Sequence, residues 1–332
     1  MPELIKHIFP GHGEFYFGDC RELLATLPDK SIDLVLTDPP YFRVVSNEWD
    51  RQWPDIFAFQ AWGGQIGVEL KRVTKDNASI YWFGDDKTIA YCQTELDKHF
   101  SLINSLIWNK TNPNVKGIMS YRMYGITTER ILFYEHKNVN GLPASGLEAI
   151  HSRPDCFQSI KQYMRAERAK LMKAMGFTTI KQCSNYLTEL LGHTAHRHYF
   201  DDSQFEILNA ENYAKLQKSG FFGREYEDLR REYEDLRRVW HPDLNAREVL
   251  TFNNPATKYH PTQKPLELIA YLLDRSSNTG MTVLDPFAGS GTTAIAAIRQ
   301  GCRFICCEKD RAYFDAAVAR IQRETAQLRL PL

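Results

Sequence analysis

The sequence predicts an α/β protein whose largely parallel sheet is assembled from two separate parts of the chain. Three observations support this fold class. Short apolar runs alternate with helical patterns over residues 15–134, as in sheets with crossover helices. The same alternation returns over residues 260–308, and the segment between the two parts is mainly helical instead.

The individual elements follow from local periodicity. In the first part we expect strands at residues 15–17, 32–36, 78–83, 101–109 and 130–134, with helices at 21–27 and 57–70. In the last part we expect a helix at 266–273, a strand at 282–284, a helix through Ile295 and Ile298, and a strand at 303–307. Residues 109–127, rich in Asn, Gly and Lys, predict a long loop, which in a compact domain is often functional.

Composition excludes several classes of protein. The chain has 332 residues, 43% hydrophobic and 25% charged, which is typical of a globular protein. It shows neither a signal segment nor an apolar run long enough for a bilayer, so we expect no membrane partner and a cytoplasmic location. Seven scattered cysteines without CxxC spacing predict reduced thiols and no metal site. Lys plus Arg equal Asp plus Glu at 41 each, so any nucleic-acid surface must be local.

A rigid loop follows the second predicted strand and reads Thr-Asp-Pro-Pro-Tyr-Phe over residues 37–42. Its adjacent prolines restrict φ and remove two backbone donors, which leaves the carbonyls of Pro39 and Pro40 free to accept hydrogen bonds. Asp38 adds a carboxylate and Tyr41 a π face, and together these groups suit a flat ring that carries an amino group. The alternative is a strand that ends in a turn, with Asp38 capping and Tyr41 packing.

A glycine-rich loop follows the strand at 282–284 and reads Asp-Pro-Phe-Ala-Gly-Ser-Gly-Thr-Thr over residues 285–293. Glu308 ends the next strand, nineteen residues after Gly289, the spacing at which nucleotide-type folds place a carboxylate on ribose hydroxyls. The loop is neither GxGxxG nor a P-loop, so we expect a ribose with a charged amino-acid tail instead of a pyrophosphate. Small residues let the backbone approach that tail, and Asp285 would accept from its ammonium. The alternative is an ordinary turn between a strand and a helix.

The middle segment, residues 141–253, is polarised in charge. Residues 151–200 carry eight Lys and Arg against three Asp and Glu, whereas residues 201–250 carry eight against twelve. The heptad EYEDLRR occurs twice, at 225–231 and 232–238. It predicts a helix that packs on its own segment or on a partner subunit, with one stripe made of Tyr226, Leu229, Tyr233, Leu236 and Trp240. His193, His196 and His198 fit no standard zinc finger, so surface or DNA-contacting roles are favoured over zinc.

The two loops, in this order, resemble those of the β-class S-adenosylmethionine-dependent DNA amino-methyltransferases. Residues 18–20, Gly-Asp-Cys, and residues 260–265, His-Pro-Thr-Gln-Lys-Pro, are similar to lesser motifs of the same family. The resemblance covers residues 15–140 and 255–320, and residues 192–215 look like recognition segments of phage-type relatives.

That resemblance implies a Rossmann-like, mainly parallel seven-stranded sheet in circularly permuted order. It implies a catalytic half at residues 1–140, a target-recognition insert at 141–253 and a cofactor-binding half at 254–332. The implied reaction transfers a methyl group from S-adenosyl-L-methionine to the exocyclic amino group of a flipped-out adenine in double-stranded DNA. A homodimer and a restriction-modification context are also implied, although the sequence does not show whether a partner nuclease exists.

The expected site residues divide into three sets. The catalytic set is Asp38, Pro39, Pro40 and Tyr41. The cofactor set is Asp19, at the adenine, with Lys264, which helps to close the pocket, and Cys20, Asp285, Phe287, Ala288, Gly289, Ser290, Gly291, Thr292 and Glu308. Candidate DNA contacts are Phe42, Lys110, Arg122, Arg165, Lys173, Lys181, His196 and Arg197. Cytosine as the target base, an RNA substrate, and a DNA-binding module that keeps the cofactor structurally remain alternatives.

Overall fold

The computed structural model describes residues 4–112, 126–136, 157–200, 205, 207–236, 239–241, 246–255 and 259–327. The chain divides into two compact units. The sheet unit comprises Met1–His136 and Arg238–Leu332, and the helical unit comprises Lys137–Arg237. The helical unit ends well before the expected boundary at residue 253, because the segment that follows adds a strand to the sheet.

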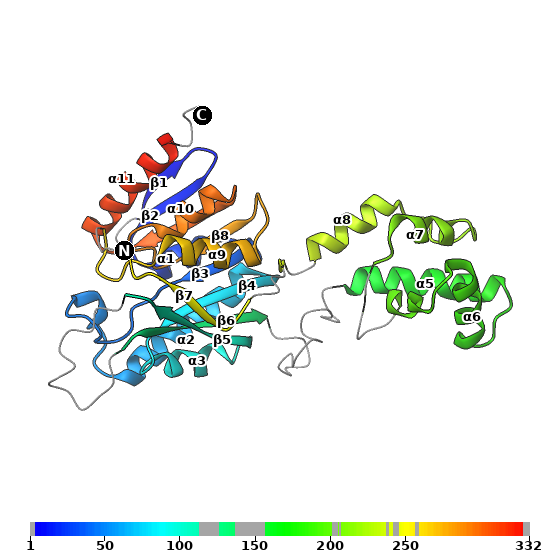
Figure 1. The fold of residues 1–332 in the computed structure, drawn as a ribbon, viewed down its shortest axis with the longest axis horizontal. Coiled ribbons are helices and arrows are strands. Elements are labelled where there is room, and N and C mark those ends of the chain that lie inside the picture. The colour runs from blue at the N-terminus through cyan, green and yellow to red at the C-terminus, as the bar shows by residue number, and fades with distance from the viewer. Residues whose placement is uncertain are drawn as a thin grey trace. The chain divides into compact units, whose positions relative to one another are not determined.

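The sheet unit contains nine strands and most of the helices (Figure 1). Its strands are β1 Ile5–Phe9, β2 Gly13–Phe17, β3 Ile32–Thr37, β4 Thr74–Gly84, β5 Phe100–Lys110, β6 Thr128–His136, β7 Val249–Phe252, β8 Thr282–Asp285 and β9 Arg303–Glu308. Its helices are α1 Cys20–Thr26, α2 Ile56–Val73, α3 Ile89–Leu96, α9 Leu266–Ser276, α10 Thr292–Arg299 and α11 Arg311–Gln327, with the short 3-10 turn η1 Glu48–Asp50.

The strands form one mixed sheet in the order β1-β2-β9-β8-β3-β4-β6-β5-β7. Five neighbouring pairs are parallel, and the pairs β1/β2, β4/β6 and β5/β6 are antiparallel. The predicted number of seven strands is therefore wrong. The two additional strands, β1 and β7, lie at the edges of the sheet, where short segments with little periodicity gain their conformation from pairing with a neighbour.

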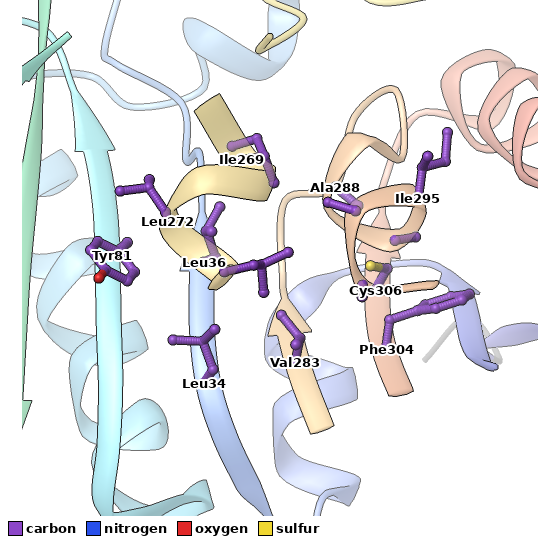
Figure 2. Close-up of a cluster of buried hydrophobic side chains, with 14 of the residues drawn as sticks. Leu34, Leu36, Tyr81, Ile269, Leu272, Val283, Ala288, Ile295, Phe304 and Cys306 are labelled. Atoms are coloured by element: carbon purple, nitrogen blue, oxygen red, sulfur yellow. The ribbon is translucent and has the colours of Figure 1, made fainter. Parts of the chain in front are cut away.

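Helices cover both faces of the sheet. On one face, alternate side chains of β3, β8 and β9 pack against α9, α10 and α11. Figure 2 shows this cluster, with Leu34, Leu36, Val283 and Phe304 directed from the strands toward the helices. On the opposite face, α1, α2 and α3 pack on the other side chains of the same strands. Burial on both faces explains why the centre of β3, Leu34 to Leu36, is continuously apolar.

The sheet changes direction between β3 and β8. From β3 the chain passes through α2 to β4, and from β8 it passes through α10 to β9, so the two connections leave in opposite directions along the sheet. Parallel pairing sets Leu34 opposite Val283 and Val35 opposite Leu284, which brings the carboxyl ends of both strands together. Ligands of open α/β sheets bind at such a switch point. Both motif loops predicted from the sequence begin there.

The helical unit has a hydrophobic core of its own. Its elements are α5 Gln158–Ala174, α6 Ile180–Leu191, η3 Thr194–Tyr199, α7 Ala210–Gln217 and α8 Tyr226–Leu236. Tyr226, Leu229 and Tyr233 of the heptad repeat pack into this core, as the interpretation of a helix on its own segment requires. The predicted stripe is wrong at Trp240. That ring lies beyond the end of α8 and stacks on Phe133 of the sheet unit, with ring centroids 5.6 Å apart.

Among the described residues, no helix combines the length and the apolar character needed to cross a membrane.

Candidate active site

A pocket opens at the switch point, between the loops that follow β3 and β8. It is lined by the catalytic set, Asp38 to Tyr41, and by every member of the predicted cofactor set except Gly291. Gly291 instead begins α10 with a φ of 73°, a left-handed conformation that glycine adopts without strain. The Thr37 hydroxyl donates to Asp285 across the two strand ends, at 3.0 Å. The folded sheet therefore joins the two motifs that the sequence separates.

Asp38 is enclosed by hydrogen-bond donors. The Tyr41 hydroxyl donates to its Oδ1 at 2.5 Å, and the Lys264 ammonium donates to its Oδ2 at 2.5 Å. The Lys264 side chain is only 5% exposed, and its nitrogen lies 5.2 Å from the centre of the Tyr41 ring. Lys264 lines the pocket as expected, but it contacts the predicted catalytic carboxylate directly, which the sequence did not indicate.

The charges of this cluster affect one another. Burial raises the pKa of Asp38, and the neighbouring Glu129 carboxylate raises it further, while the Lys264 ammonium opposes the shift. Burial alone would lower the pKa of Lys264, but Asp38 and Glu129 outweigh it and leave that pKa raised. Burial and the two carboxylates raise the pKa of Tyr41 well above its ordinary value. Lys264 is therefore a cation and Tyr41 a neutral donor at physiological pH.

The loop after Asp38 is held by a residue that sequence reasoning missed. Asp50, 1% exposed, accepts hydrogen bonds from the backbone of Tyr41 and of Val45, both at 2.8 Å. Its own carbonyl accepts from the backbone of Arg43 at 2.7 Å. Phe42 and Arg43 have φ values of 66° and 63°, a left-handed backbone conformation that residues other than glycine rarely adopt. No motif marks Asp50, so nothing in the sequence alone could have identified it.

The glycine-rich loop is organised by Asp285. Its Oδ2 accepts from the Thr293 hydroxyl at 2.6 Å, and its Oδ1 accepts from Thr37 and from the Phe287 amide at 3.1 Å. Burial raises its pKa to about 6 despite these donors. A carboxylate has about four acceptor sites, so Asp285 retains limited capacity for an ammonium group and also shapes the loop.

Glu308 and Asp19 approach the same pocket from β9 and from the start of α1. Glu308 accepts from the amides of Gly289 and Asp310, at 3.0 and 2.7 Å, and burial raises its pKa to about 7. Asp19 caps α1 and forms an ion pair with Arg21 at 2.8 Å, and the hydrogen bonds from Arg21 lower its pKa. Both carboxylates line the pocket, although backbone or side-chain donors of the protein already engage each of them.

The pocket fits S-adenosylmethionine in its chemistry. Two residues that line it, Trp49 and Gln263, each contain a buried polar atom without a hydrogen-bond partner, the indole nitrogen and the side-chain carbonyl oxygen. A Cβ on Gly289 would lie 3.3 Å from the His260 ring, so glycine at this position lets the loop pack closely on His260 at the pocket wall. Phe287 and Trp62, with ring centroids 5.4 Å apart, provide aromatic surface. Carboxylates, rings and exposed backbone suit a ligand with hydroxyls, a charged tail and a heteroaromatic ring.

Two candidate DNA contacts on the sheet unit, Phe42 and Lys110, are partly buried against neighbouring side chains. Phe42 does not line the pocket, and its ring packs on Phe59 with centroids 5.6 Å apart. The DNA contact expected of Phe42 therefore stays a prediction. Lys110 forms a buried ion pair with Glu129 at 2.6 Å, so it belongs to the charged cluster around Asp38. Arg122 lies outside the described residues.

The candidates on the helical unit differ in exposure: some are exposed and others are partly or fully buried. Lys173 and Lys181 are exposed, as a phosphate contact requires. Arg165 is half-buried and donates to the Phe200 carbonyl at 3.1 Å. His196 is 3% exposed and shares a 2.9 Å hydrogen bond with the Thr188 hydroxyl, so it occupies a core position and the expected surface role is corrected. The side chain of Arg197 lies outside the described part of the chain.

Comparison with known proteins places this site in a family. The family model described as DNA methylase, for N6 and N4 methyltransferases, matches residues 32–319. The chain belongs to the N6/N4 DNA methylase family. The type II methyltransferase M.HinfI of Haemophilus influenzae is 25% identical over 323 residues, which cover 92% of this chain and 67% of M.HinfI.

Solved structures of DNA methyltransferases share the fold. The PvuII DNA methyltransferase, described as cytosine-N4-specific, aligns with 95% of this chain and 90% of its own, at a TM-score of 0.55 and 14% identity. The M1.HpyAVI complex with S-adenosylmethionine aligns with 92% of this chain and 98% of its own, at a TM-score of 0.51 and 19% identity. At these identities the likeness concerns the fold alone.

Family membership confirms the coarse prediction made from the motifs. This member of the DNA methylase family is an S-adenosylmethionine-dependent amino-methyltransferase that acts on DNA, at N6 of adenine or N4 of cytosine.

Proposed function

We propose that this DNA methylase transfers the methyl group to the N6 amino group of adenine in duplex DNA, with Asp38 as the principal acceptor. One observation carries the proposal: the Asp38 carboxylate lines the switch-point pocket between both motif loops. The motif opens with aspartate, Asp-Pro-Pro-Tyr, and not with serine. In the family that the motifs resemble, the aspartate form accompanies adenine.

The amino group must first become a nucleophile. The nitrogen lone pair is delocalised into the base, so the amino group is a poor nucleophile. When Asp38 and the Pro39 carbonyl each accept one of its hydrogens, the nitrogen can pyramidalise and direct its lone pair at the methyl group. These acceptors are in fixed positions before the base arrives, because Asp50 and two prolines hold the loop.

The transfer releases one proton from the amino nitrogen as the nitrogen–carbon bond forms. Asp38 would accept that proton, and its raised pKa favours this role. The cofactor supplies an electrophilic methyl group on a positively charged sulfur, so no covalent protein intermediate is needed. Asp19, Asp285, Glu308 and the glycine-rich loop would hold it, through acceptors for its hydroxyls and ammonium.

Tyr41 has two proposed contacts. Its hydroxyl holds Asp38 in place, and its ring would stack on the target base after the base leaves the duplex. The ring is 8% exposed in this structure, so stacking requires it to become more accessible. Stacking is therefore a prediction of the proposal that fluorescence of a 2-aminopurine target base can measure.

The helical unit is the proposed target-recognition region. Its exposed basic side chains, Lys173 and Lys181, would contact phosphates. A homodimer is also part of the proposal, on family resemblance alone. Sedimentation that finds only monomer at all concentrations would contradict the dimer and leave the transfer reaction unaffected.

The decisive experiment identifies the modified base. Duplex DNA is incubated with the protein and labelled S-adenosylmethionine and then digested to nucleosides, and we expect label in N6-methyladenine. Label in N4-methylcytosine would overturn the choice of base, and preferential labelling of RNA would overturn the substrate. Asp38→Ala should abolish transfer while cofactor binding is retained, whereas unchanged transfer would remove Asp38 from the mechanism. Asp38→Asn is the matched control, since it keeps the shape and one acceptor oxygen.

A further inference from the structure

Two charged residues outside every sequence motif complete the cluster around Asp38. Glu129 lies on β6 and Lys110 at the end of β5, and their side chains are 15% and 16% exposed. Lys110 Nζ is 2.6 Å from Glu129 Oε1. The cluster thus contains two carboxylates and two ammonium groups, so its charges balance when all four groups are ionised.

Asp38 already accepts two short hydrogen bonds from protein donors in this structure, and the target amino group would compete with them. One of its oxygens accepts from the Tyr41 hydroxyl and the other from Lys264, each at 2.5 Å. A third donor on Asp38 competes for the same negative charge, so the hydrogen bond to the target amino group is strongest when one of these contacts weakens. A buried hydroxyl or ammonium that loses its acceptor carries a large desolvation penalty. The displaced donor therefore needs a second acceptor within reach.

Glu129 is that second acceptor for both donors. Its Oε2 lies 3.1 Å from the Tyr41 hydroxyl and 3.3 Å from the Lys264 nitrogen. A shift of a few tenths of an ångström would turn either contact into a close hydrogen bond. Lys110 occupies the other oxygen, Oε1, which directs Oε2 toward the two donors.

We propose that Glu129 is a positioning residue for methyl transfer, which takes over whichever donor, Lys264 or the Tyr41 hydroxyl, the target amino group displaces from Asp38. The inference rests on the proposed function and adds a residue to it. Glu129 itself does not line the pocket, so it acts through the two donors and not on the base. The displaced donor then alternates between the two carboxylates without leaving the cluster.

The ionisation of the cluster is consistent with this exchange. Burial would raise the pKa of Glu129, but Lys264 and Lys110 outweigh it and leave that pKa lowered, so Glu129 keeps its charge. Asp38 faces Lys264, Tyr41, Glu129 and, from the β8 loop, Asp285. Glu129→Gln removes a negative charge from these neighbours and should lower the pKa of Asp38, because repulsion between the two carboxylates is relieved.

The test compares Glu129→Gln with wild type in single-turnover methylation of duplex DNA. We expect the transfer rate to fall by about ten- to a hundredfold, as when a preorganised charged partner is lost. Affinities for S-adenosylmethionine and DNA should stay within about twofold, and the acid limb of the rate profile should move to lower pH. Glu129→Asp keeps the charge but shortens the reach, so it should slow transfer without moving the acid limb.

The matched control is Asp86→Asn, which removes an exposed carboxylate that pairs with Arg130 of β6 at 2.6 Å, outside the pocket. It should leave the rate unchanged. Wild-type rates in both Glu129 variants, or a slower Glu129→Gln with an unmoved acid limb, would overturn the positioning role alone. A wild-type protein that methylates no DNA would overturn the proposed function and this inference together, so the two failures are distinguishable.

Discussion

Replacing Asp50 with alanine should release the loop that carries Asp38 and Tyr41, because the Asp50 carboxylate holds that loop through its backbone amides. The Asp50 carboxylate holds the amides of Tyr41 and Val45, each at 2.8 Å, and it is 1% exposed. In Asp50→Ala both amides lose their acceptor. The positive φ values of Phe42 and Arg43 would then be maintained mainly by the Arg43 hydrogen bond to the carbonyl of residue 50, which the substitution keeps.

The magnitude follows from the two lost hydrogen bonds. A buried donor without an acceptor costs about 1–3 kcal/mol, so two of them cost about 2–6 kcal/mol. Local unfolding of the loop sets an upper limit on this loss of stability, because amides that open to water find water as an acceptor. A displacement of about 1 Å at Asp38 is enough to reduce catalysis by about 10²-fold. Asp50→Asn keeps one acceptor and should lose about half of the stabilisation.

The assay is hydrogen exchange at the Tyr41 and Val45 amides, measured beside kcat/KM. Asp50→Ala should lower protection of both amides and reduce kcat/KM by about 10²-fold. Asp55→Ala is the matched control, because Asp55 is exposed and accepts one hydrogen bond from Ala58 at 2.8 Å as the cap of α2. It should cost about 1 kcal/mol and leave the loop protected. Lost activity in Asp50→Ala with both amides still protected would refute the reasoning.

Three further predictions follow from the same contacts. Burial raises the pKa of Glu308 to about 7, and an ionised carboxylate is the stronger acceptor, so cofactor affinity should weaken as pH falls from 8 to 6. Titration calorimetry of Glu308→Gln should show no such weakening. If the affinities of wild type and variant change with pH in the same way, Glu308 is excluded as the ribose contact. Thr293→Val removes the 2.6 Å donor to buried Asp285 and should lower the free energy of unfolding by about 1–3 kcal/mol in urea, and an unchanged urea midpoint would contradict it. Leu229→Ala, at a position 0% exposed in the helical unit, should destabilise that unit by about 2–5 kcal/mol. DNA binding should weaken while cofactor affinity is kept. A loss of both DNA and cofactor affinity would contradict the view that the helical unit has an independent core.

The sequence was most informative where local chemistry sets the conformation. The Pro-Pro loop and the glycine-rich loop could be predicted because their residues restrict or release φ, whatever lies around them. The central strands β3, β8 and β9 were also predictable, since burial on both faces leaves consecutive apolar residues in the middle of each strand. The edge strands β1 and β7 carry no such pattern, which is why the predicted sheet had seven strands.

The heptad periodicity gave a wrong prediction where the chain passes from the helical unit to the sheet unit. The heptad repeat predicted a stripe through Trp240, and α8 does bury Leu229 in the helical unit. Trp240, however, packs on Phe133 of the sheet unit. Spacing along a helix predicts a shared face only while the helix continues, and α8 ends at Leu236.

By itself, the sequence predicted which groups would carry the proposed chemistry: Asp38 in its rigid loop, the glycine turn before α10, and Glu308 at the end of β9. Only the tertiary structure decided what those groups contact. Lys264 is 226 residues from Asp38 in the chain, yet the order of strands in the sheet brings its ammonium to 2.5 Å from that carboxylate. Glu129 and Asp50 join the same site through the sheet and the loop. Hydrogen bonds and ion pairs depend on distances of a few ångströms, which only the packed fold sets.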